Sequence, residues 1–481
     1  MISQDLMAPI MFGGLILFLL IGYPAAFSLG AVGLFFSFIG IEMGMFQPTF
    51  LQALPDRVFG ILSNDLLLSI PFFTFMGAIL EKCGLAEDML EGLGQLFGPI
   101  RGGLAYAVII VGAILGAITG TVAASVIAMG LISLPIMLRY GYNPRVATGV
   151  IAASGTITQL IPPSLVLIVL ADQLGKSVGD MYAGAIGPSI IQIILFCLFI
   201  FFLSIFRPQD VPALPPEARP KIDWKLFKKI LWGIVPSIAL IFLVLGTILM
   251  GLATPTEGGA MGSVGALVLA AMNGRLQKTL VWDAMTSTMR INAMVIFILI
   301  GSTVFGLAFR GVDGDLWIEH LLSGLPGGQV GFLIVVNLFV FFLAFFLDYF
   351  EIAFIIIPLL APVAQKLGID LIWFGVLLGA NMQTSFMHPP FGFALFYLRG
   401  VAPKSVKSSD IYYGALPWVG LQLILVAIII FIPETVTYFI DKPAIAVDAN
   451  AISVDPLAGV EQNEITVDSS SEIERQLREN K

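Results

Sequence analysis

The 481-residue chain is poor in charge, histidine and cysteine, and each shortage excludes a class of protein. Charged residues make up 12% of the chain, about half the share in a soluble domain, so a large water-exposed domain is excluded. Two cysteines and two histidines do not supply a disulfide framework or a zinc-type ligand cluster. A P-loop is missing too, because Leu170 stands where the first glycine should precede Gly175-Lys176-Ser177. We therefore expect no ATP hydrolysis, no enzyme and no nucleic-acid partner.

What the chain has in abundance is hydrophobic residues, which make up 58% of it. Long apolar runs recur over the first 440 positions, and no soluble domain fits between them. A helix needs about 20 apolar residues to cross a bilayer, so these runs predict roughly ten to twelve spans plus shorter re-entrant pieces. The sequence thus predicts an all-α, multi-pass protein in a lipid bilayer.

The two halves of the chain repeat one another. An offset of 227 residues aligns Pro162 with Pro389, and after a three-residue insertion an offset of 230 aligns Gln192 with Gln422. Interrupted apolar segments at matching positions of two halves point to a secondary transporter whose binding site lies between the repeats. The alternative is a duplicated membrane scaffold in which the prolines merely kink helices.

Two polar segments divide the chain. Residues 207–229 hold five prolines and an excess of Lys and Arg, which predicts a cytoplasmic linker by the positive-inside rule. Asp441–Lys481 holds nine acidic and four basic residues, which predicts an acidic disordered tail. We therefore assign one membrane repeat to residues 1–206 and the other to residues 230–440. The two are inverted if each has an odd number of spans.

The first candidate site is the small-residue stretch 112–133. We predict a helical hairpin that dips into the bilayer and turns near Gly120, Thr121 and Ser125. Hydroxyls and free carbonyls at such a tip are suitable ligands for a hard cation such as Na⁺. The alternative is close helix packing, a common use of small residues in membranes.

The matching hairpin of the second repeat is predicted at residues 335–364 and contains Asp348 and Glu351. Three positions apart, the two carboxylates share one face of a helix. A charged group inside an apolar run is a functional-site hypothesis by default, so we predict that both bind Na⁺. The alternative is an interfacial position, where the carboxylates simply reach water.

The second element of each repeat is a broken helix, predicted at residues 147–171 and 372–398. Paired prolines cannot continue a helix and free carbonyl groups one turn earlier, beside hydroxyl and amide side chains. The Na⁺ ligands predicted here are Ser154, Thr156, Asn381, Gln383 and Thr384. The predicted substrate-binding residues are Thr158, Pro162, Pro163, Ser385, His388, Pro389 and Pro390.

Two further residues, His388 and Arg310, are considered because their side chains can carry positive charge. His388 precedes a Pro-Pro pair and makes proton coupling an alternative to Na⁺, although lone histidines are more often structural. Arg310 ends an apolar run and is predicted to face a substrate carboxylate, against the alternative that it snorkels to the interface.

Taken together, these stretches resemble the large membrane subunit of TRAP (tripartite ATP-independent periplasmic) transporters over residues 1–439. The resemblance rests on SIPFFTFMGAIL at 69–80, ATPTEGGA at 253–260, FLDYFEIAFIIIPLLAPVA at 346–364 and HPPFGFALFYLRGVAP at 388–403. Two departures are evident. Many relatives have serine and aspartate in the first hairpin tip, where this chain reads GTVAAS, and threonine where this chain has His388.

The resemblance implies an elevator-type transporter built from two inverted repeats, each with a re-entrant hairpin and a broken helix. It also implies Na⁺-driven import of carboxylates across the bacterial inner membrane, with 2-oxo acids, lactate and C4-dicarboxylates as candidates. The partners implied are a small membrane subunit on a separate chain and a periplasmic substrate-binding protein.

Two competing functions stay open at this point. A stand-alone Na⁺/carboxylate symporter of the divalent-anion family would share the fold without the partners. A non-transporting scaffold or an intramembrane enzyme would use the polar residues differently. An enzyme needs a nucleophile and a base within reach, and Ser154 and Ser385 have no histidine at a comparable position in both repeats.

Overall fold

A computed structural model describes residues 4–219, 224–389 and 392–440, and every regular element in these ranges is a helix. The all-α membrane fold predicted from the sequence is confirmed. The predicted tail, Asp441–Lys481, and Pro390 lie outside the described residues.

The elements of the first half are α1 Gln4–Ile21, α2 Ala25–Glu42, η1 Pro48–Ala53, α3 Leu54–Leu62, α4 Asp65–Lys82, α5 Leu85–Phe97, α6 Gly103–Thr119, α7 Val122–Arg139, α8 Pro144–Thr156, η2 Ile157–Gln159, α9 Leu165–Leu174 and α10 Val178–Phe206. Short helices η3 Pro208–Asp210 and η4 Pro216–Ala218 follow. Those of the second half are α11 Trp224–Ile241, η5 Phe242–Gly246, α12 Thr247–Leu249, α13 Pro255–Met272, α14 Lys278–Gly311, α15 Gly314–Ser323, α16 Gly328–Leu343, α17 Tyr349–Glu351, η6 Ile352–Ile356, α18 Ile357–Lys366, α19 Leu371–Met382, η7 Gln383–Phe386, α20 Phe393–Val401, α21 Ser408–Phe431 and α22 Glu434–Thr437.

The number of helices able to cross a bilayer is smaller than the sequence suggested. Seven stretches of the described chain are long and apolar enough, or eight if the bent pair Pro48–Leu62 and Asp65–Lys82 is one span. The ten to twelve spans expected from the sequence are therefore too many, because five of the apolar helices have only 10–17 residues. At 1.5 Å per residue, such a helix is shorter than the roughly 30 Å hydrocarbon core.

The sequence repeat is also a structural repeat. Shifted by 227 residues, α7 coincides with the span Tyr349–Lys366, which comprises α17, η6 and α18. The helices before the two breaks, α8 and α19, begin at capping side chains that are equivalent at the same offset. Asn143 accepts a hydrogen bond from the Arg145 amide (3.0 Å), and Asp370 accepts one from the Ile372 amide (2.9 Å). These caps satisfy amides that would otherwise lack a partner at the helix start.

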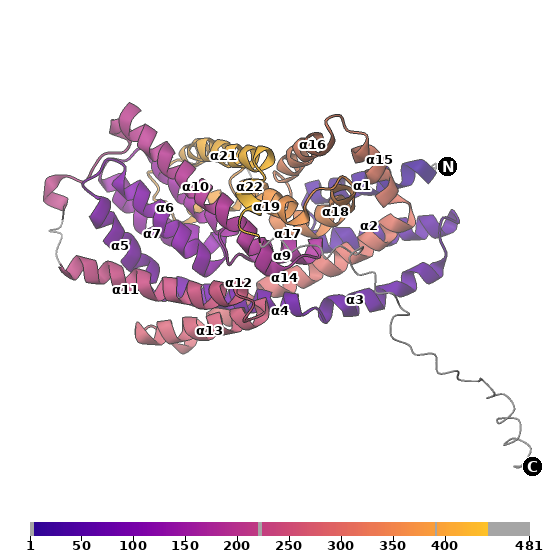
Figure 1. Cartoon of the computed structure of the whole chain (residues 1–481), viewed down its shortest axis with the longest axis horizontal. Helices are drawn as coiled ribbons and strands as arrows, with labels where there is room; N and C mark the ends of the chain where they lie inside the picture. The colour runs from indigo at the N-terminus through magenta and orange to yellow at the C-terminus, as the bar shows by residue number, and fades with distance from the viewer. Residues whose placement is uncertain (1–3, 220–223, 390–391, 441–481) are drawn as a thin grey trace, which may run out of the picture. The chain divides into compact units, whose positions relative to one another are not determined.

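The repeats pack in a crossed manner. The helix before each break packs on the long helix of the other repeat, α8 on α21 and α19 on α10. The helices at the hairpin tips follow the same rule, α7 on α20 and α18 on α9, and so do α2 on α14 and α4 on α13. Figure 1 shows α10 and α21 above, and α11, α13 and α3 below. Contacts between the two repeats therefore make up a large part of the core, beside contacts within the first repeat such as α7 on α8 and α5 on α6.

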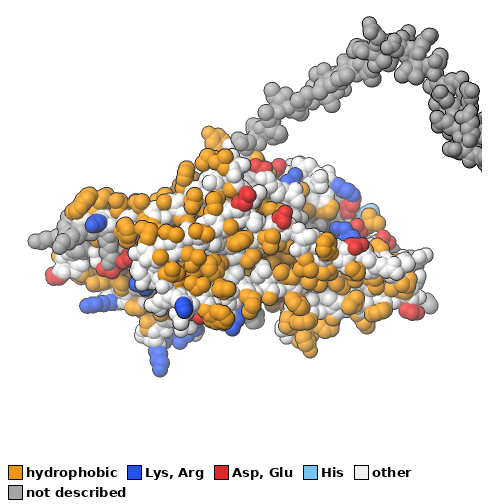
Figure 2. All heavy atoms as spheres, turned by 90° about the horizontal axis from the view of Figure 1, so that it is seen from below, with side chains coloured by type: hydrophobic (Ala, Val, Ile, Leu, Met, Phe, Trp, Pro, Cys, Tyr) orange, Lys and Arg blue, Asp and Glu red, His pale blue; other side chains and the backbone are white. Residues whose placement is uncertain are grey.

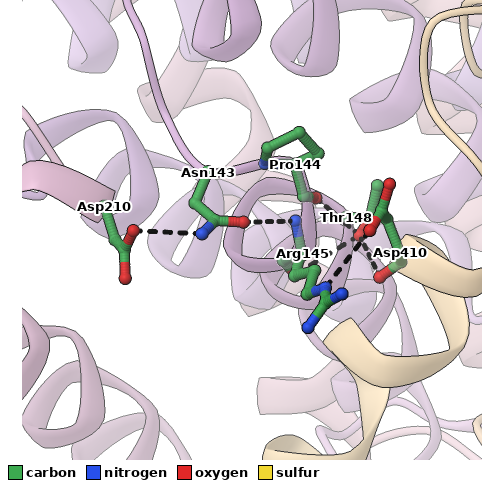
Figure 3. Close-up of polar contacts among 6 residues, drawn as sticks. All are labelled: Asn143, Pro144, Arg145, Thr148, Asp210 and Asp410. Atoms are coloured by element: carbon green, nitrogen blue, oxygen red, sulfur yellow. Dashed lines mark hydrogen bonds and ion pairs between the residues drawn. The ribbon is translucent and has the colours of Figure 1, made fainter.

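The base of the first hairpin is fastened to the linker. The Gly102 amide donates to the Val211 carbonyl (3.0 Å), and the Leu214 amide donates to the Gly98 carbonyl (2.8 Å). The Asn143 side-chain amide donates to the Asp210 carboxylate (3.0 Å; Figure 3). Because both legs of the hairpin end at the linker, its tip is directed away from the linker into the core.

The surface fits a bilayer. Large hydrophobic side chains are exposed along the long helices, for example Phe202 and Phe206 of α10. On the face in Figure 2, hydrophobic side chains extend across the middle of the molecule from one end to the other, and charged side chains are few there. An apolar face of this extent is typical of a lipid-exposed surface rather than a water-exposed one.

Candidate functional site

The tips of the two hairpins meet around one cavity of about 240 Å³. The first hairpin contributes Gly120 and Thr121, and the second contributes Asp348 and Tyr349. Gly120 ends α6 with a positive φ of 61°, a conformation that glycine adopts without strain, and the chain turns there into α7. The two segments that the sequence repeat identified as hairpin tips are thus brought together.

The hydroxyl-bearing residues of the first tip divide into two groups. Thr121 lines the cavity, whereas Ser125 is buried behind it, with its hydroxyl 3.1 Å from the hydroxyl of Thr119. Thr119 in turn donates to the Leu115 carbonyl (2.9 Å). Ser125 therefore braces the turn from inside, and Thr121 is the tip hydroxyl with access to the cavity.

The second tip is a capping box. The Asp348 carboxylate accepts a hydrogen bond from the Glu351 amide (2.8 Å), and the Glu351 carboxylate accepts one from the Asp348 amide (3.0 Å). A π-helical turn, η6, follows, and Ser302 of α14 donates to its Phe354 carbonyl (2.5 Å). The sequence predicted two carboxylates on one helix face, and the structure places them at the helix start, where the helix dipole favours negative charge.

No Lys or Arg in the described part of the chain pairs with either carboxylate of this tip. Asp348 and Glu351 also line a second hollow of about 410 Å³ between α2 and α14, whose walls include Pro24, Phe27 and Met294. A carboxylate at membrane depth without a basic partner is costly unless it is neutralised. The second tip is thus suited to a cation.

The first break is buried and polar. Thr156 accepts a hydrogen bond from the side-chain amide of Gln422 (3.0 Å), and Thr158 donates to the Gly155 carbonyl (2.9 Å). The Ser154 hydroxyl has no hydrogen-bond partner among the described residues and is fully buried. The first break therefore has one side-chain oxygen without a partner, on Ser154, and a hydrogen-bonded hydroxyl two residues later, on Thr156.

Glycines of α6 lie directly against this break. A Cβ added to Gly112 would lie 2.7 Å from the Ser154 Cβ, and one added to Gly116 would lie 2.9 Å from the Thr158 Cα. The close-packing alternative weighed for residues 112–133 is thus realised for these two glycines, while Gly120 forms the turn. The stretch 112–133 therefore contains both closely packed glycines and the turn of the hairpin.

The second break has an equivalent arrangement. The Asn381 side-chain amide donates to the carbonyl (2.7 Å) and to the side-chain oxygen (3.1 Å) of Asn337. Gln383 accepts a hydrogen bond from Gln192 (2.7 Å), while Thr384 and Ser385 donate to carbonyls one turn earlier. The Asn381 side-chain oxygen itself has no partner among the described residues.

Ser154 and Asn381, the residues with the free oxygens, are equivalent at the 227-residue offset. Buried polar atoms are nearly always hydrogen-bonded, because leaving one unpaired costs about 1–3 kcal/mol. The same exception at the same place in both repeats indicates a shared purpose. Oxygen is the donor that a hard cation prefers, so the residues present fit a Na⁺ ion at each break.

None of the predicted substrate-binding residues in the described part of the chain lines the cavity between the tips. Pro163 borders a much smaller gap behind the first tip, beside Thr121. His388 is 1% exposed, with its ring stacked on Phe345 (4.2 Å between centroids) and edge-on to Phe341 (4.4 Å). The other predicted residues outside the cavity lining are Thr158, Pro162, Ser385 and Pro389.

Arg310 lies at a different place. It lines a hollow of about 650 Å³ together with Arg57, Asp172 and Lys366, a set that shares no residue with the lining of the cavity between the tips. Contact with a substrate held between the tips is therefore not evident for Arg310.

The cavity also contains residues that the sequence reasoning missed. Its walls include the aromatic side chains Phe350, Phe386, Phe393 and Tyr397, together with Gln159. A signal was present, because two of the aromatic residues belong to the FGFALFY stretch after the second Pro-Pro pair. No Lys, Arg or His is among the described residues that line this cavity.

Comparisons with known proteins agree with this architecture. Residues 12–435 match the family described as "Tripartite ATP-independent periplasmic transporter, DctM component". The chain is 29% identical to the C4-dicarboxylate TRAP transporter large permease protein DctM of Pseudomonas aeruginosa, over 81% of this chain and 89% of that protein. It is 26% identical to the isethionate TRAP transporter permease protein DctMQ of Oleidesulfovibrio alaskensis, over 90% of this chain and 66% of that protein.

Among solved structures, the chain resembles the YdaH transporter of Alcanivorax borkumensis. The TM-score is 0.56 at 16% identity, and the match covers 79% of this chain and 86% of that one. At this level of identity the likeness supports the fold alone.

Proposed function

Because the chain belongs to the DctM component family of tripartite ATP-independent periplasmic transporters, we propose that it imports an organic anion with Na⁺ as the coupling ion. It is a large permease subunit, a multi-pass protein of the bacterial inner membrane and not an enzyme. The identity of the ion, the class of substrate and the mechanism of movement are the parts proposed.

The observation that carries the proposal is the pair of buried, unpartnered oxygens on Ser154 and Asn381. Each lies beside a hairpin whose tip reaches the central cavity. A Na⁺ ion bound at each break would satisfy these oxygens and would place positive charge against the first leg of each hairpin, α6 or α16. Exposed carbonyls where α8 and α19 end would supply further oxygen ligands.

The composition of the cavity supports an anion bound together with cations. The described residues around it include Asp348 but no basic side chain. An isolated carboxylate buried in such a site is prohibitively costly, whereas one that is neutralised by bound cations is not. Both relatives described above are named for organic anions, a C4-dicarboxylate and isethionate, which is consistent with this charge balance. Within this class we favour a carboxylate.

For the movement we propose an elevator mechanism. The hairpins and breaks, α6–α10 and α16–α21, would move as one body against the remaining helices and carry the anion between the tips. Two partners are proposed. One is a small membrane subunit on a separate chain, which would stay fixed together with the helices that do not move. The other is a periplasmic binding protein that delivers the substrate.

Thermal stability of the purified subunit, titrated with NaCl and with KCl at matched ionic strength, tests the proposal without knowledge of the substrate. A ligand that binds only the folded state stabilises it by about 2.7 kcal/mol at a hundred times its dissociation constant. We expect the melting temperature to rise in NaCl and not in KCl, and the rise to shrink in Ser154→Ala. Equal curves in the two salts would contradict Na⁺ coupling.

A further inference from the structure

Two glutamine side chains lie buried in the middle of the long apolar helices. Gln192 is in α10 and Gln422 is in α21, and both are fully buried. The two residues are equivalent at the 230-residue offset of this part of the repeat. A buried amide in an apolar helix is costly unless it is hydrogen-bonded, so its occurrence at one place in both repeats calls for a reason.

Each glutamine reaches into the break of the opposite repeat. The Gln422 side-chain nitrogen donates to the Thr156 hydroxyl in the first break (3.0 Å). The Gln192 side-chain nitrogen donates to the Gln383 side-chain oxygen in the second break (2.7 Å). Thr156 and Gln383 are themselves equivalent at the 227-residue offset, so the same contact is made twice with the repeats exchanged.

The contacts are made where each helix gives way to the break. Thr156 is the last residue of α8, and Gln383 is the first residue of η7, directly after α19. Each follows by two positions the residue with the free oxygen, Ser154 or Asn381. A hydrogen bond at this point fixes the backbone turn that presents both the free oxygen and the carbonyls around it.

One of these helices touches both breaks. On α10, Ser189 donates to the Leu160 carbonyl of the first break (3.2 Å), one turn before Gln192 reaches the second break. The side-chain oxygens of Gln192 and Gln422 have no partner among the described residues, and neither do the Ser154 hydroxyl, the Asn381 side-chain oxygen and the Gln383 side-chain nitrogen. Each break thus carries a free side-chain oxygen, and so does the glutamine that donates to it.

We propose that Gln192 and Gln422 are positioning residues for the cation sites, and that each sets the ion affinity of the break in the repeat to which it does not belong. The inference rests on the proposed Na⁺ coupling. The glutamine nitrogen holds the hydroxyl or amide of the break, and the break holds its oxygen ligands in place for the ion. The plain alternative is that the amides only bind helices together, as polar side chains often do in membranes.

The variants Gln192→Met and Gln422→Met test the proposal, because methionine is unbranched, of similar length and unable to make the hydrogen bond. The measured quantity is the Na⁺ dissociation constant, from the melting temperature in NaCl against KCl. We expect about fivefold weaker Na⁺ binding in each, the effect of one lost hydrogen bond, together with a lower melting temperature in KCl because Thr156 or Gln383 loses a buried partner. Purely structural amides would lower the melting temperature in KCl in the same way but leave the Na⁺ dissociation constant unchanged.

A matched control is Ser37→Ala. Ser37 is also fully buried, and its hydroxyl donates to the Gly33 carbonyl (2.8 Å) in α2, away from both breaks. This variant should bind Na⁺ as the unaltered protein does. Thr156→Val removes the contact of Gln422 from its other end and should weaken Na⁺ binding to the same degree, which keeps the test open if Gln422→Met does not fold.

Double variants test whether each glutamine acts on the cation site of the opposite repeat. In a Ser154→Ala background, where the first site is already impaired, Gln422→Met should add little and Gln192→Met should still weaken binding about fivefold. In an Asn381→Ala background the order should be reversed. Glutamine variants with unaltered Na⁺ affinity, in a protein that itself responds to Na⁺, would overturn this inference alone. An unaltered protein without any Na⁺ response would overturn the proposed function as well.

Discussion

The side-chain Nε of Arg145 lies 3.2 Å from the Asp410 carboxylate, and this ion pair joins the start of α8 in the first repeat to the start of α21 in the second (Figure 3). The Arg145 guanidinium also lies 5.3 Å from the centre of the Tyr413 ring. The Thr148 hydroxyl donates to the Pro144 carbonyl one turn earlier (2.7 Å) and lies within longer hydrogen-bond distance of the Arg145 (3.3 Å) and Asp410 (3.4 Å) backbone carbonyls, so it adds a second link between α8 and α21.

We predict that this ion pair contributes little to stability. The Arg145 side chain is 56% exposed, and exposed ion pairs are typically worth about 0–1 kcal/mol. Arg145→Ala should lower the stability of the purified subunit by less than about 1 kcal/mol, and the difference should shrink in 1 M KCl because salt screens the pair. A loss of several kcal/mol would mean that the pair is far better shielded from water than the structure indicates.

Close backbone contact between the same two helices should matter more. A Cβ on Gly149 of α8 would lie 2.2 Å from the Gly414 carbonyl oxygen of α21, a distance that no side chain can tolerate. Gly149→Ala should therefore destabilise the protein by about 1–3 kcal/mol or more, because α21 must move away. The matched control is Gly30→Ala in α2, where a Cβ would meet nothing within 4 Å. Thermal melts of both variants in KCl check the contrast, and an equal effect would contradict it.

Neutralising the carboxylate at the second tip should weaken Na⁺ dependence without unfolding the protein. Asparagine caps a helix about as well as aspartate, so Asp348→Asn should preserve the start of α17 while removing the charge that a cation would neutralise. We expect a normal melting temperature in KCl and a reduced rise in NaCl. Full Na⁺-driven uptake by this variant in proteoliposomes that contain all subunits would exclude Asp348 from the site.

Ser154→Ala removes an oxygen that makes no hydrogen bond within the described residues. Its loss should leave stability in KCl unchanged or slightly improved, because an unpaired buried polar group is itself unfavourable. Na⁺ affinity should nevertheless fall, by about tenfold if the hydroxyl binds the ion as strongly as a group hydrogen-bonded to a charge. The measurement is the NaCl titration of the melting temperature. A variant that is destabilised in KCl but binds Na⁺ normally would show that the hydroxyl has a structural role instead.

Asn381→Ala provides the comparison in the second repeat. Here the side-chain amide donates to Asn337, so a loss of about 1 kcal/mol in KCl is expected in addition to weaker Na⁺ binding. The double variant with Ser154→Ala should combine both losses of affinity if the two sites are independent. If only one of the two single variants loses Na⁺ affinity, then only one of the two breaks binds Na⁺.

The all-α fold and the places of the two tips could be predicted because both depend on local pattern. The offset of 227 residues alone identifies Asp348 as the equivalent of Thr121, and both residues directly precede the helix that follows the tip. The number of full spans could not be predicted from apolar runs, because the legs of a hairpin are as apolar as a spanning helix but shorter.

The details of the site depend on long-range packing, which the sequence pattern does not contain. Nothing near His388 in the sequence indicates that its ring lies against Phe345, about forty positions earlier. The aromatic walls of the cavity and the position of Arg310 in another hollow likewise follow from which helices cross. The repeat reveals which residues are equivalent, but not that the side chains of Gln192 and Gln422 each contact the break of the opposite repeat.

The crossed packing of α8 on α21 and of α19 on α10 bears on how such a protein could originate and how it is made. A half-length ancestor could have formed these contacts only as a pair of chains, each supplying the partner helix of the other. During synthesis, the helix before the first break must wait for α21, more than 250 residues later, before its polar face is covered. Until α21 is made, the polar end of α8 therefore lacks Gln422, the side chain that donates to its Thr156 hydroxyl.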